Sequence, residues 1–219
     1  KFRSRGCIAG TAWRGDSFIM QIGESSIDSF LDALASKEPT PGGGAVAGLL
    51  ASIASSLGNM VLAYSEGKKS LAEHCDVHAD CFSILQEAQS EAIRLGNADA
   101  QAYEKVSELW KLPKDNATRI ESWDAVHLDA ARVPIEIMKL SENVLQTLRR
   151  LRGKTNAMLR SDLLIAALVA ETAARSAFYN VGVNTGQVAD AAQKEKLDAQ
   201  ASKILATCRV LALTIETTC

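Results

Sequence analysis

The chain has 219 residues, of which 47% are hydrophobic and 23% charged, and its net charge is −2. This balance is typical of one globular domain with a sizeable core, and it excludes a disordered or fibrous chain. The near-neutral charge lacks the basic surface that a phosphate backbone requires, so nucleic acid is not an expected partner. The odd number of cysteines, five, indicates free thiols and predicts a cytoplasmic location.

The first 19 residues differ in character from the rest of the chain. They carry four basic residues before the first acidic residue, Asp16, and they show no helical periodicity. We interpret residues 1–19 as a leader or extension that is not part of the domain: a transit-like segment, an expression remnant, or sequence upstream of a start at Met20. The domain is therefore predicted to span residues 20–219.

Helix-forming residues dominate, and no alternating strand pattern of useful length is present, so an all-α fold is predicted. Ser25 or Ser26 is expected to cap the first helix. The Pro-Thr-Pro-Gly-Gly-Gly sequence at 39–44 ends it, and a second helix follows over 45–64. This second stretch is uncharged and long enough to span a membrane. Its serines and glycines are too polar and small for lipid, so we expect the central helix of a bundle and no membrane.

Four further helices complete the predicted bundle. A long amphipathic helix is expected over 70–109, with a kink or cap at Gly96-Asn97. Thr118 is expected to cap a segment that runs through Pro134 to Arg152, and two more helices are expected over 161–181 and about 197–215. A helix of ~40 residues is about 60 Å long. We therefore predict a single domain of long helices that forms a homodimeric bundle, because a partner would cover the outer apolar stripes.

Three consecutive glycines, Gly42, Gly43 and Gly44, open the second helix. Backbone N–H groups at a helix start favour an anionic ligand, and glycine leaves them unobstructed. The alternative interpretation is a tight turn at which two helix backbones crowd together, which also requires glycine.

Asp99 lies four residues after Leu95 and seven before Val106, which places it on the apolar stripe of the third helix. Burial raises the pKa of a carboxyl group, and a carboxyl with a raised pKa can act as a general acid near neutral pH. The neighbouring alanines leave room for a flat ligand. The alternative is a helix cap after Gly96-Asn97, because aspartate is a common N-cap.

Polar residues lie at both ends of the predicted helix over 161–181. Asp162 and Asn180 share one stripe with Asn184, but they are five turns apart, about 27 Å. They therefore serve different sites, or one site shared between two chains. The alternative is structural, with Ser161-Asp162 capping the helix start and an asparagine its exit.

His74 and His78 are four residues apart on one helix, close to Cys75 and Cys81. A zinc site would need a His-Glu-x-x-His or paired Cys-x-x-Cys arrangement, and neither is present. We expect no metal at these residues.

Several short motifs recur together in a known family. In chain order the sequence resembles the formiminotetrahydrofolate cyclodeaminase family from about Ser25 to the C-terminus, and the ordered set is more specific than any one motif. The motifs are Pro39 to Gly44, Ala98 to Tyr103, Lys111-Leu112-Pro113-Lys114, Val133-Pro134, Ser161-Asp162, and Asn180-Val181 with Asn184.

The resemblance implies an all-α homodimer with active sites at or near the subunit interface and with no metal or other cofactor. It implies conversion of 5-formiminotetrahydrofolate to 5,10-methenyltetrahydrofolate and ammonia, or methenyltetrahydrofolate cyclohydrolase activity at the same site. A helical dimer that binds folate or a protein partner without turnover is the alternative of another class.

The resemblance also implies roles for individual residues. Asp99 is then the catalytic acid and base, and Gly42 to Gly44 are candidates for the folate's carboxylates. Ser161, Asp162, Asn180 and Asn184 are further candidate substrate-binding residues. Asn97 departs from the family, which often has an acidic residue there, so one possible carboxylate partner of Asp99 is absent.

Overall fold

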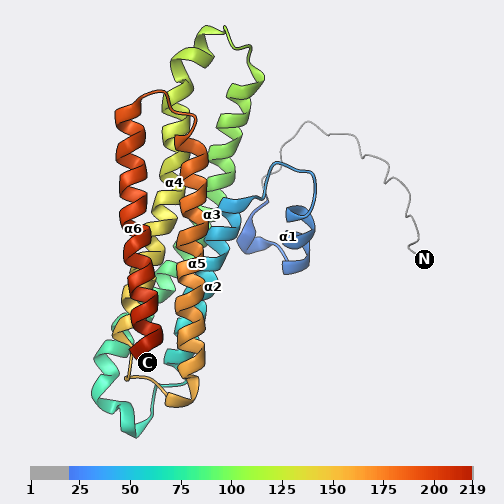
Figure 1. The fold of residues 1–219 in the computed structure, drawn as a ribbon. Coiled ribbons are helices and arrows are strands. Elements are labelled where there is room, and N and C mark those ends of the chain that lie inside the picture. Colours follow the sequence, from blue (N-terminus) through green and yellow to red (C-terminus); the bar gives the residue numbers. More distant parts are fainter. Residues whose placement is uncertain (1–19, 219) are drawn as a thin grey trace, which may run out of the picture.

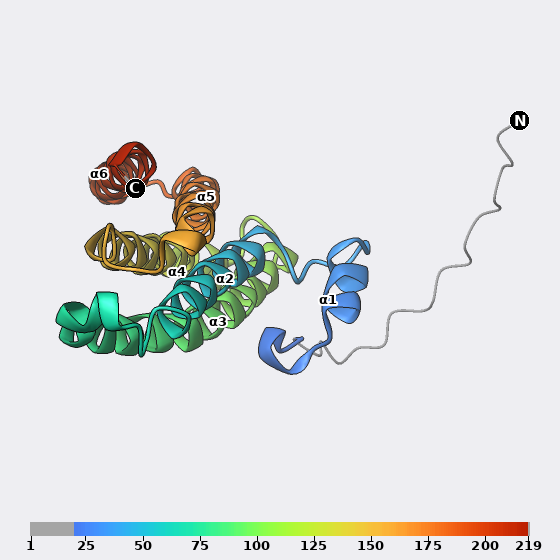
Figure 2. The same ribbon diagram turned by 90° about the horizontal axis from the view of Figure 1, so that it is seen from below.

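The computed structural model describes residues 20–218, so the expected leader at residues 1–19 lies outside the described part of the chain. The all-α prediction is confirmed, since residues 20–218 form helices and turns without a strand. Five long helices pack side by side in an elongated bundle, and one short helix, α1, projects from its side (Figures 1 and 2). The six α-helices are α1 (Ile27–Leu34), α2 (Gly43–Ala63), α3 (Cys75–Lys111), α4 (Ala117–Arg150), α5 (Arg160–Thr185) and α6 (Ala191–Thr218). Short 3-10 turns lie at Ile22–Glu24, Lys69–His74 and Ala157–Leu159.

Helix α1 is held at its start by Ser26, whose side-chain oxygen accepts a hydrogen bond from the Ser29 N–H at 3.1 Å. Of the two expected caps, Ser26 is the one that forms. Phe30 is the buried residue of this short helix, and it clusters with Ile22 and Ala45 apart from the main core. This cluster packs α1 against the side of the bundle, from which the helix projects in Figure 2.

Helix α2 lies against α3 and α5 and contains many small residues. A Cβ atom on Gly48 would lie 2.7 Å from the Ala92 carbonyl oxygen and 2.8 Å from the Gly96 Cα. The two helix backbones therefore meet here, and only glycine permits that approach. Among the described residues α2 is the one helix long and apolar enough to cross a membrane, and 56% of that stretch is buried inside the bundle.

Helix α3 runs without interruption from Cys75 to Lys111, so a cap at Gly96-Asn97 is wrong. Gly96 lies inside the helix, against Gly48 of α2, and a Cβ atom on Gly96 would lie 2.8 Å from the Ile22 side chain. Asp99 consequently lies in the middle of a helix, and its alternative interpretation as a cap is also wrong.

Two other predicted helix starts differ from the structure. Asn116, rather than Thr118, caps α4, because its side-chain oxygen accepts from the Arg119 N–H at 3.2 Å. Helix α5 starts at Arg160, so Ser161 and Asp162 lie inside its first turn. The residue at the cap position of α5, Leu159, makes no side-chain hydrogen bond. The capping interpretation of Ser161-Asp162 is therefore wrong.

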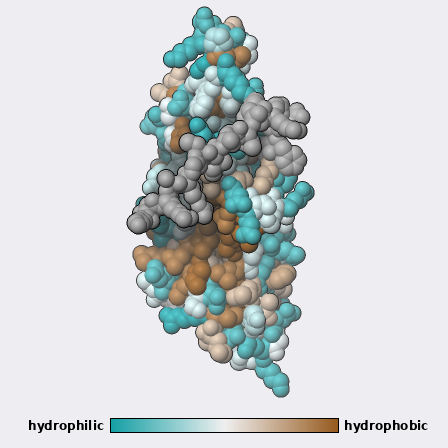
Figure 3. Space-filling view, turned by 90° about the vertical axis from the view of Figure 1, so that its right-hand side faces the viewer, coloured by the Kyte–Doolittle hydropathy of each residue, from teal (hydrophilic) through white to brown (hydrophobic). Residues whose placement is uncertain are grey.

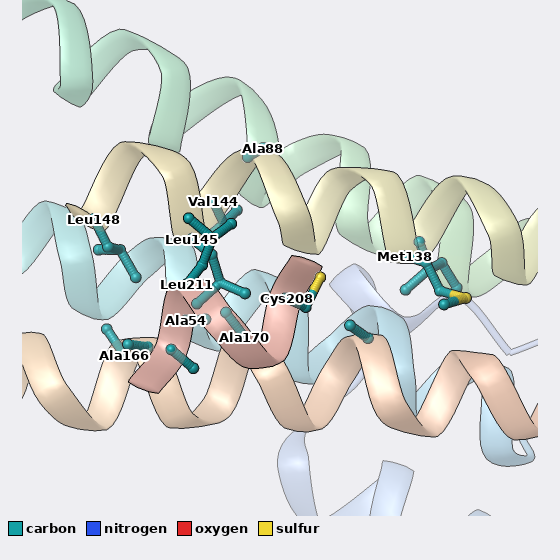
Figure 4. Packing of buried hydrophobic residues seen from close by; sticks show 14 of the residues in the cluster. Ala54, Ala88, Met138, Val144, Leu145, Leu148, Ala166, Ala170, Cys208 and Leu211 are labelled. Carbon is teal, nitrogen blue, oxygen red and sulfur yellow. The ribbon is translucent and has the colours of Figure 1, made fainter. Parts of the chain in front are cut away.

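The main core lies where α4 faces the other long helices. Val144, Leu145 and Leu148 of α4 are fully buried, and Figure 4 shows them among small side chains of the neighbouring helices. Those neighbours include Ala54 of α2, Ala166 and Ala170 of α5, and Cys208 and Leu211 of α6. The alanines allow close helix packing, which sets the relative positions of the helices that form the site below.

Candidate functional site

A cavity of about 220 Å³ lies where α2 begins, and four helices contribute to its wall. It is open to solvent on one side. Its lining residues are Pro39, Thr40, Gly42, Gly43, Gly44, Asp99, Ala102, Tyr103, Ala130, Asn180, Val183 and Asn184. The structure thus brings together six of the eight residues singled out in the sequence: the three glycines, Asp99, Asn180 and Asn184.

The glycines at the start of α2 make room for polar side chains from other helices. A Cβ atom on Gly44 would lie 2.0–2.2 Å from the carboxyl atoms of Asp99, and one on Gly43 would lie 3.0 Å from the Asn180 Oδ1. Gly42 is less constrained, since the nearest atom to its Cβ position is 3.9 Å away. Close packing therefore explains Gly44 fully, and the Asp99 carboxyl group already sits against this helix start.

Asp99 is the acidic residue of this cavity, and it is half-buried in the wall formed by α3. Burial raises the pKa of its carboxyl group from 3.8 to about 6. No lysine, arginine or histidine is among the described residues that line the cavity, so no nearby cation offsets this effect. A carboxyl group that titrates close to neutral pH can both accept and donate a proton in one reaction cycle.

Two asparagines of α5, Asn180 and Asn184, line the same cavity as Asp99. The Asn184 amide donates to the Ala130 carbonyl oxygen at 3.3 Å and to the Asn180 carbonyl oxygen at 3.1 Å, which fixes its orientation. The Asn180 Nδ2 is buried and has no hydrogen-bond partner within the described residues. A buried amide without a partner is costly, so this N–H group is suited to donate to a bound ligand.

Asn97 does not line the cavity, although it precedes Asp99 by only two residues. Its Oδ1 accepts a hydrogen bond from the Ile22 backbone N–H at 3.0 Å and so ties the segment before α1 to α3. Because position 97 lies outside the wall that the described residues form, having asparagine there rather than an acidic residue leaves the cavity wall unchanged.

Ser161 and Asp162 lie at the other end of α5, outside this cavity. Because α5 is continuous, the predicted separation of about 27 Å between Asp162 and Asn180 holds within one chain. His74 and His78 lie near the start of α3, also far from the cavity, and the His78 Nε2 is 2.6 Å from the Lys154 carbonyl oxygen. Within residues 20–218, no group of three or more His, Cys, Asp or Glu side chains could hold a metal ion.

Sequence reasoning missed several wall residues. Tyr103 lies four residues after Asp99 on the same helix face, so helical spacing would have identified it. Val183 could have been found in the same way from Asn180. Ala130 carries no such signal, because an alanine of α4 reaches the wall only through the packing of α4 against α5.

Comparison with known proteins identifies the family. The profile described as formiminotransferase-cyclodeaminase matches residues 26–203, most of the chain. The chain belongs to this family. The chicken formimidoyltransferase-cyclodeaminase is 27% identical over 183 residues, which cover 82% of this chain and 34% of that protein. This chain thus spans about a third of the length of that relative.

Two further relatives match along nearly their whole length. The methenyltetrahydrofolate cyclohydrolase of Methylorubrum extorquens is 30% identical over 181 residues, which cover 80% of this chain and 86% of that protein. The crystal structure of formiminotetrahydrofolate cyclodeaminase from Thermotoga maritima superposes with a TM-score of 0.82, covering 90% of this chain and 96% of that one. At 23% identity, that likeness establishes the shared fold.

Proposed function

We propose that the protein is a folate one-carbon enzyme that converts 5-formiminotetrahydrofolate to 5,10-methenyltetrahydrofolate and ammonia. One observation carries this proposal: Asp99, whose pKa is raised to about 6, lines the same cavity as Asn180, whose amide Nδ2 is buried and unpaired within the described residues. Family membership supports the choice of a folate as the ligand.

The proposed reaction needs one group that moves a proton twice. N10 of the folate attacks the formimino carbon and forms a tetrahedral centre, and the Asp99 carboxylate accepts the N10 proton. The carboxyl group then donates a proton to the departing nitrogen, which leaves as ammonia while the methenyl bridge forms. The Asn180 amide is placed to hydrogen-bond the substrate beside this centre, and it fixes the orientation of the reacting carbon.

Methenyltetrahydrofolate cyclohydrolase activity is the second candidate. The Methylorubrum cyclohydrolase favours it, because that relative matches this chain over 86% of its own length. Water would then attack the methenyl carbon, and Asp99 would accept a proton from the water. Asp99 would return this proton to N5 as the bond between N5 and the carbon breaks, which leaves a 10-formyl group and releases the second water proton to solvent. Both candidates use the same cavity and the same carboxyl group.

The deciding experiment supplies purified protein with each folate in turn. Formation of the methenyl absorbance together with ammonia from 5-formiminotetrahydrofolate supports the cyclodeaminase. Loss of the methenyl absorbance faster than the buffer rate supports the cyclohydrolase. Folate binding without turnover of either compound would instead favour the non-catalytic helical dimer.

We also propose that two copies associate through the face formed by α2 and α5. These helices pack side by side, and Ile53, Ile165 and Leu168 on them are 45–50% exposed. Figure 3 shows an apolar patch with a polar rim on the side of the molecule that carries α1. Patches of this kind mark protein interfaces. The cavity opens near the same two helices, since Gly43 and Val183 line it, so a second copy would lie close to the site.

Sedimentation tests the dimer. Ile53→Asp/Leu168→Asp should sediment as a monomer at micromolar concentration, whereas Val210→Asp, at an apolar residue of α6 that is 65% exposed, should remain a dimer. A wild-type monomer would contradict the proposal. We also propose a cytoplasmic location, which is supported by the free thiols of Cys75, Cys81 and Cys208.

A further inference from the structure

The Asp99 cavity is too small for a whole folate. Its volume, about 220 Å³, is below the ~300–1,000 Å³ of pockets that enclose a complete drug-sized ligand. In the proposed reaction Asp99 moves protons at the one-carbon group on N5, and N5 belongs to the pterin ring. The pterin ring is therefore the part of the folate that would lie in the cavity, and the rest of the molecule would extend outside.

Asn180 leaves one hydrogen-bond donor for this ring. A Cβ atom on Gly43 would lie 3.0 Å from the Asn180 Oδ1 and 3.5 Å from its Nδ2, so the oxygen is the amide atom nearer to the start of α2. The first N–H groups of a helix have no helical partner, and they favour an acceptor such as this oxygen. The Nδ2 is buried and has no partner within the described residues, so it is the atom left to donate to a ligand.

Asn184 leaves one hydrogen-bond acceptor. Its Nδ2 donates to the Ala130 carbonyl oxygen at 3.3 Å and to the Asn180 carbonyl oxygen at 3.1 Å. An amide nitrogen has two N–H groups, so both are used within the protein. Since Asn184 lines the cavity, its Oδ1 is the polar atom that remains for a ligand. The two asparagines of α5 thus offer opposite hydrogen-bonding functions, a donor and an acceptor.

These polar groups match one edge of a reduced pterin. The Asp99 carboxyl group lies against Gly44 and the Asn180 amide against Gly43, the preceding residue of α2. Asn184 follows Asn180 by one helical turn, so both can contact one small ring. In a reduced pterin, the C4 carbonyl oxygen is the acceptor next to N5, and the N3–H donor follows it along the same edge. An acid, a donor and an acceptor therefore correspond to N5, the C4 carbonyl oxygen and N3–H.

We propose that the two asparagines recognise the 4-oxo edge of the pterin, with the Asn180 Nδ2 donating to the C4 carbonyl oxygen and the Asn184 Oδ1 accepting from N3–H. This inference rests on the proposed function, which supplies the folate. The bond to the C4 carbonyl oxygen also holds N5 beside Asp99, because that oxygen and N5 are attached to adjacent ring carbons. Choice of the pterin thus belongs to α5, and proton transfer belongs to α3.

A pterin with a 4-amino group in place of the 4-oxo group reverses both contacts. Its amino group is a donor and meets the N–H groups of Asn180, and its N3 is an acceptor and meets the Asn184 Oδ1. Each mismatch leaves a buried polar group without a partner, which costs more than the loss of a hydrogen bond to water. The two asparagines therefore discriminate between two pterins of nearly the same shape.

The test measures the dissociation constants of 5-formyltetrahydrofolate and of its 4-amino analogue by calorimetric titration. Both compounds carry a formyl oxygen in place of the reacting imino nitrogen, so binding is measured apart from cyclodeaminase turnover. Wild type should bind the 4-oxo compound at least about thirtyfold more tightly than the 4-amino compound, the effect of two mismatched hydrogen bonds.

Asn180→Asp keeps the shape of the side chain, and its carboxyl oxygens can accept from a 4-amino group. We expect the ratio of the two dissociation constants to fall below about threefold or to invert. The ratio within one variant cancels any general loss of affinity caused by a new carboxyl group near Asp99. Asn180→Ala, which only removes the donor, should give an intermediate ratio. Asn143→Asp, at an exposed asparagine of α4, is the matched control and should keep the wild-type ratio.

Three results would overturn the proposal: a wild-type ratio within about threefold, no binding of either compound to wild type, or the wild-type ratio in both Asn180 variants. A fall in the Asn143→Asp control equal to that in Asn180→Asp would also overturn it. Discrimination between the two compounds without turnover of any folate would instead count against the proposed function alone.

Discussion

The two ends of α5 carry similar polar residues and have different surroundings. At the C-terminal end, Asn180 and Asn184 face the start of α2, Asp99 of α3 and Ala130 of α4 around one cavity. At the N-terminal end, Ser161 is exposed and Asp162 is partly exposed, and neither lines that cavity. A polar residue on a helix therefore becomes part of a site only where other helices contribute a wall.

The difference has a cause in side-chain size. Near the cavity end, α2 supplies Gly43, Gly44 and Gly48, so the neighbouring helices approach closely and polar groups converge in a small space. Near the other end, the large side chains of Leu148 and Leu163 are fully buried and fill the space between the helices. Substitutions of individual residues test this difference between the two ends of α5.

The largest expected effect is at the cavity end. Asp99→Asn should lower turnover by roughly 10²-fold or more, because asparagine keeps the volume of aspartate and loses the titratable proton. Folate affinity should stay close to wild type. The measurement is steady-state turnover beside a binding titration, with Asp76→Asn, an exposed position on the same helix, as the control. Turnover within threefold of wild type would remove the catalytic assignment and leave family membership intact.

The next effect concerns the glycine against Asp99. Gly44→Ala puts a methyl group within 2.0–2.2 Å of the Asp99 carboxyl atoms, so Asp99 must move, and we expect activity to fall by at least about tenfold. Gly182→Ala on α5 is the matched control, because no atom lies within 4 Å of its Cβ position. There alanine should raise the free energy of unfolding by about 0.5–1 kcal/mol and leave activity unchanged. An active Gly44→Ala enzyme would show that the position of Asp99 is not critical.

A smaller effect tests whether the far end of α5 serves the cavity of a second copy. Within one chain Asp162 is too far from Asn180 for one small ligand, so its predicted role in substrate binding requires a site shared between subunits. Asp162→Asn should then raise KM by roughly threefold to tenfold. Dimers that combine Asp99→Asn and Asp162→Asn chains should regain wild-type KM at one of their two sites. If these mixed dimers do not regain the wild-type KM, Asp162 has no role in substrate binding.

The fold and half of the site could be predicted from patterns in the sequence. Helical spacing placed Asp99 on the buried stripe of α3, and the glycines marked the start of α2. The cap expected at Gly96-Asn97 was wrong, because α3 continues through Gly96, which packs closely against Gly48 of α2 and forms no turn. The grouping of Asp99 with Asn180, and the separation of Asp162 from both, depend on how the helices pack. A single chain's periodicity does not contain that information.

The smallest effect is on stability, and its sign follows from the Asp99 pKa. Burial raises this pKa from 3.8 to about 6, so the folded protein binds the proton more tightly than the unfolded chain. The stabilising contribution of the protonated group is fully present below pH ~4 and is lost as pH rises through about 6. Above that pH the folded protein carries a charge that burial disfavours. Asp99→Asn removes this cost, on the order of 3 kcal/mol.

Thermal unfolding of wild type and Asp99→Asn at several pH values measures this effect, and the difference between the two proteins cancels the other titrating groups. The melting temperatures should be equal near pH 4, and the variant should melt several degrees higher at pH 8, at roughly 2–4 °C per kcal/mol for a chain of this size. The enzyme would then retain Asp99 at a cost in stability, as expected of a residue kept for its chemistry. A variant that instead melts lower at pH 8 would show that the backbone N–H groups at the start of α2 stabilise the carboxylate more than burial penalises it, and Asp99 would then be ionised throughout the neutral range and serve only as a base.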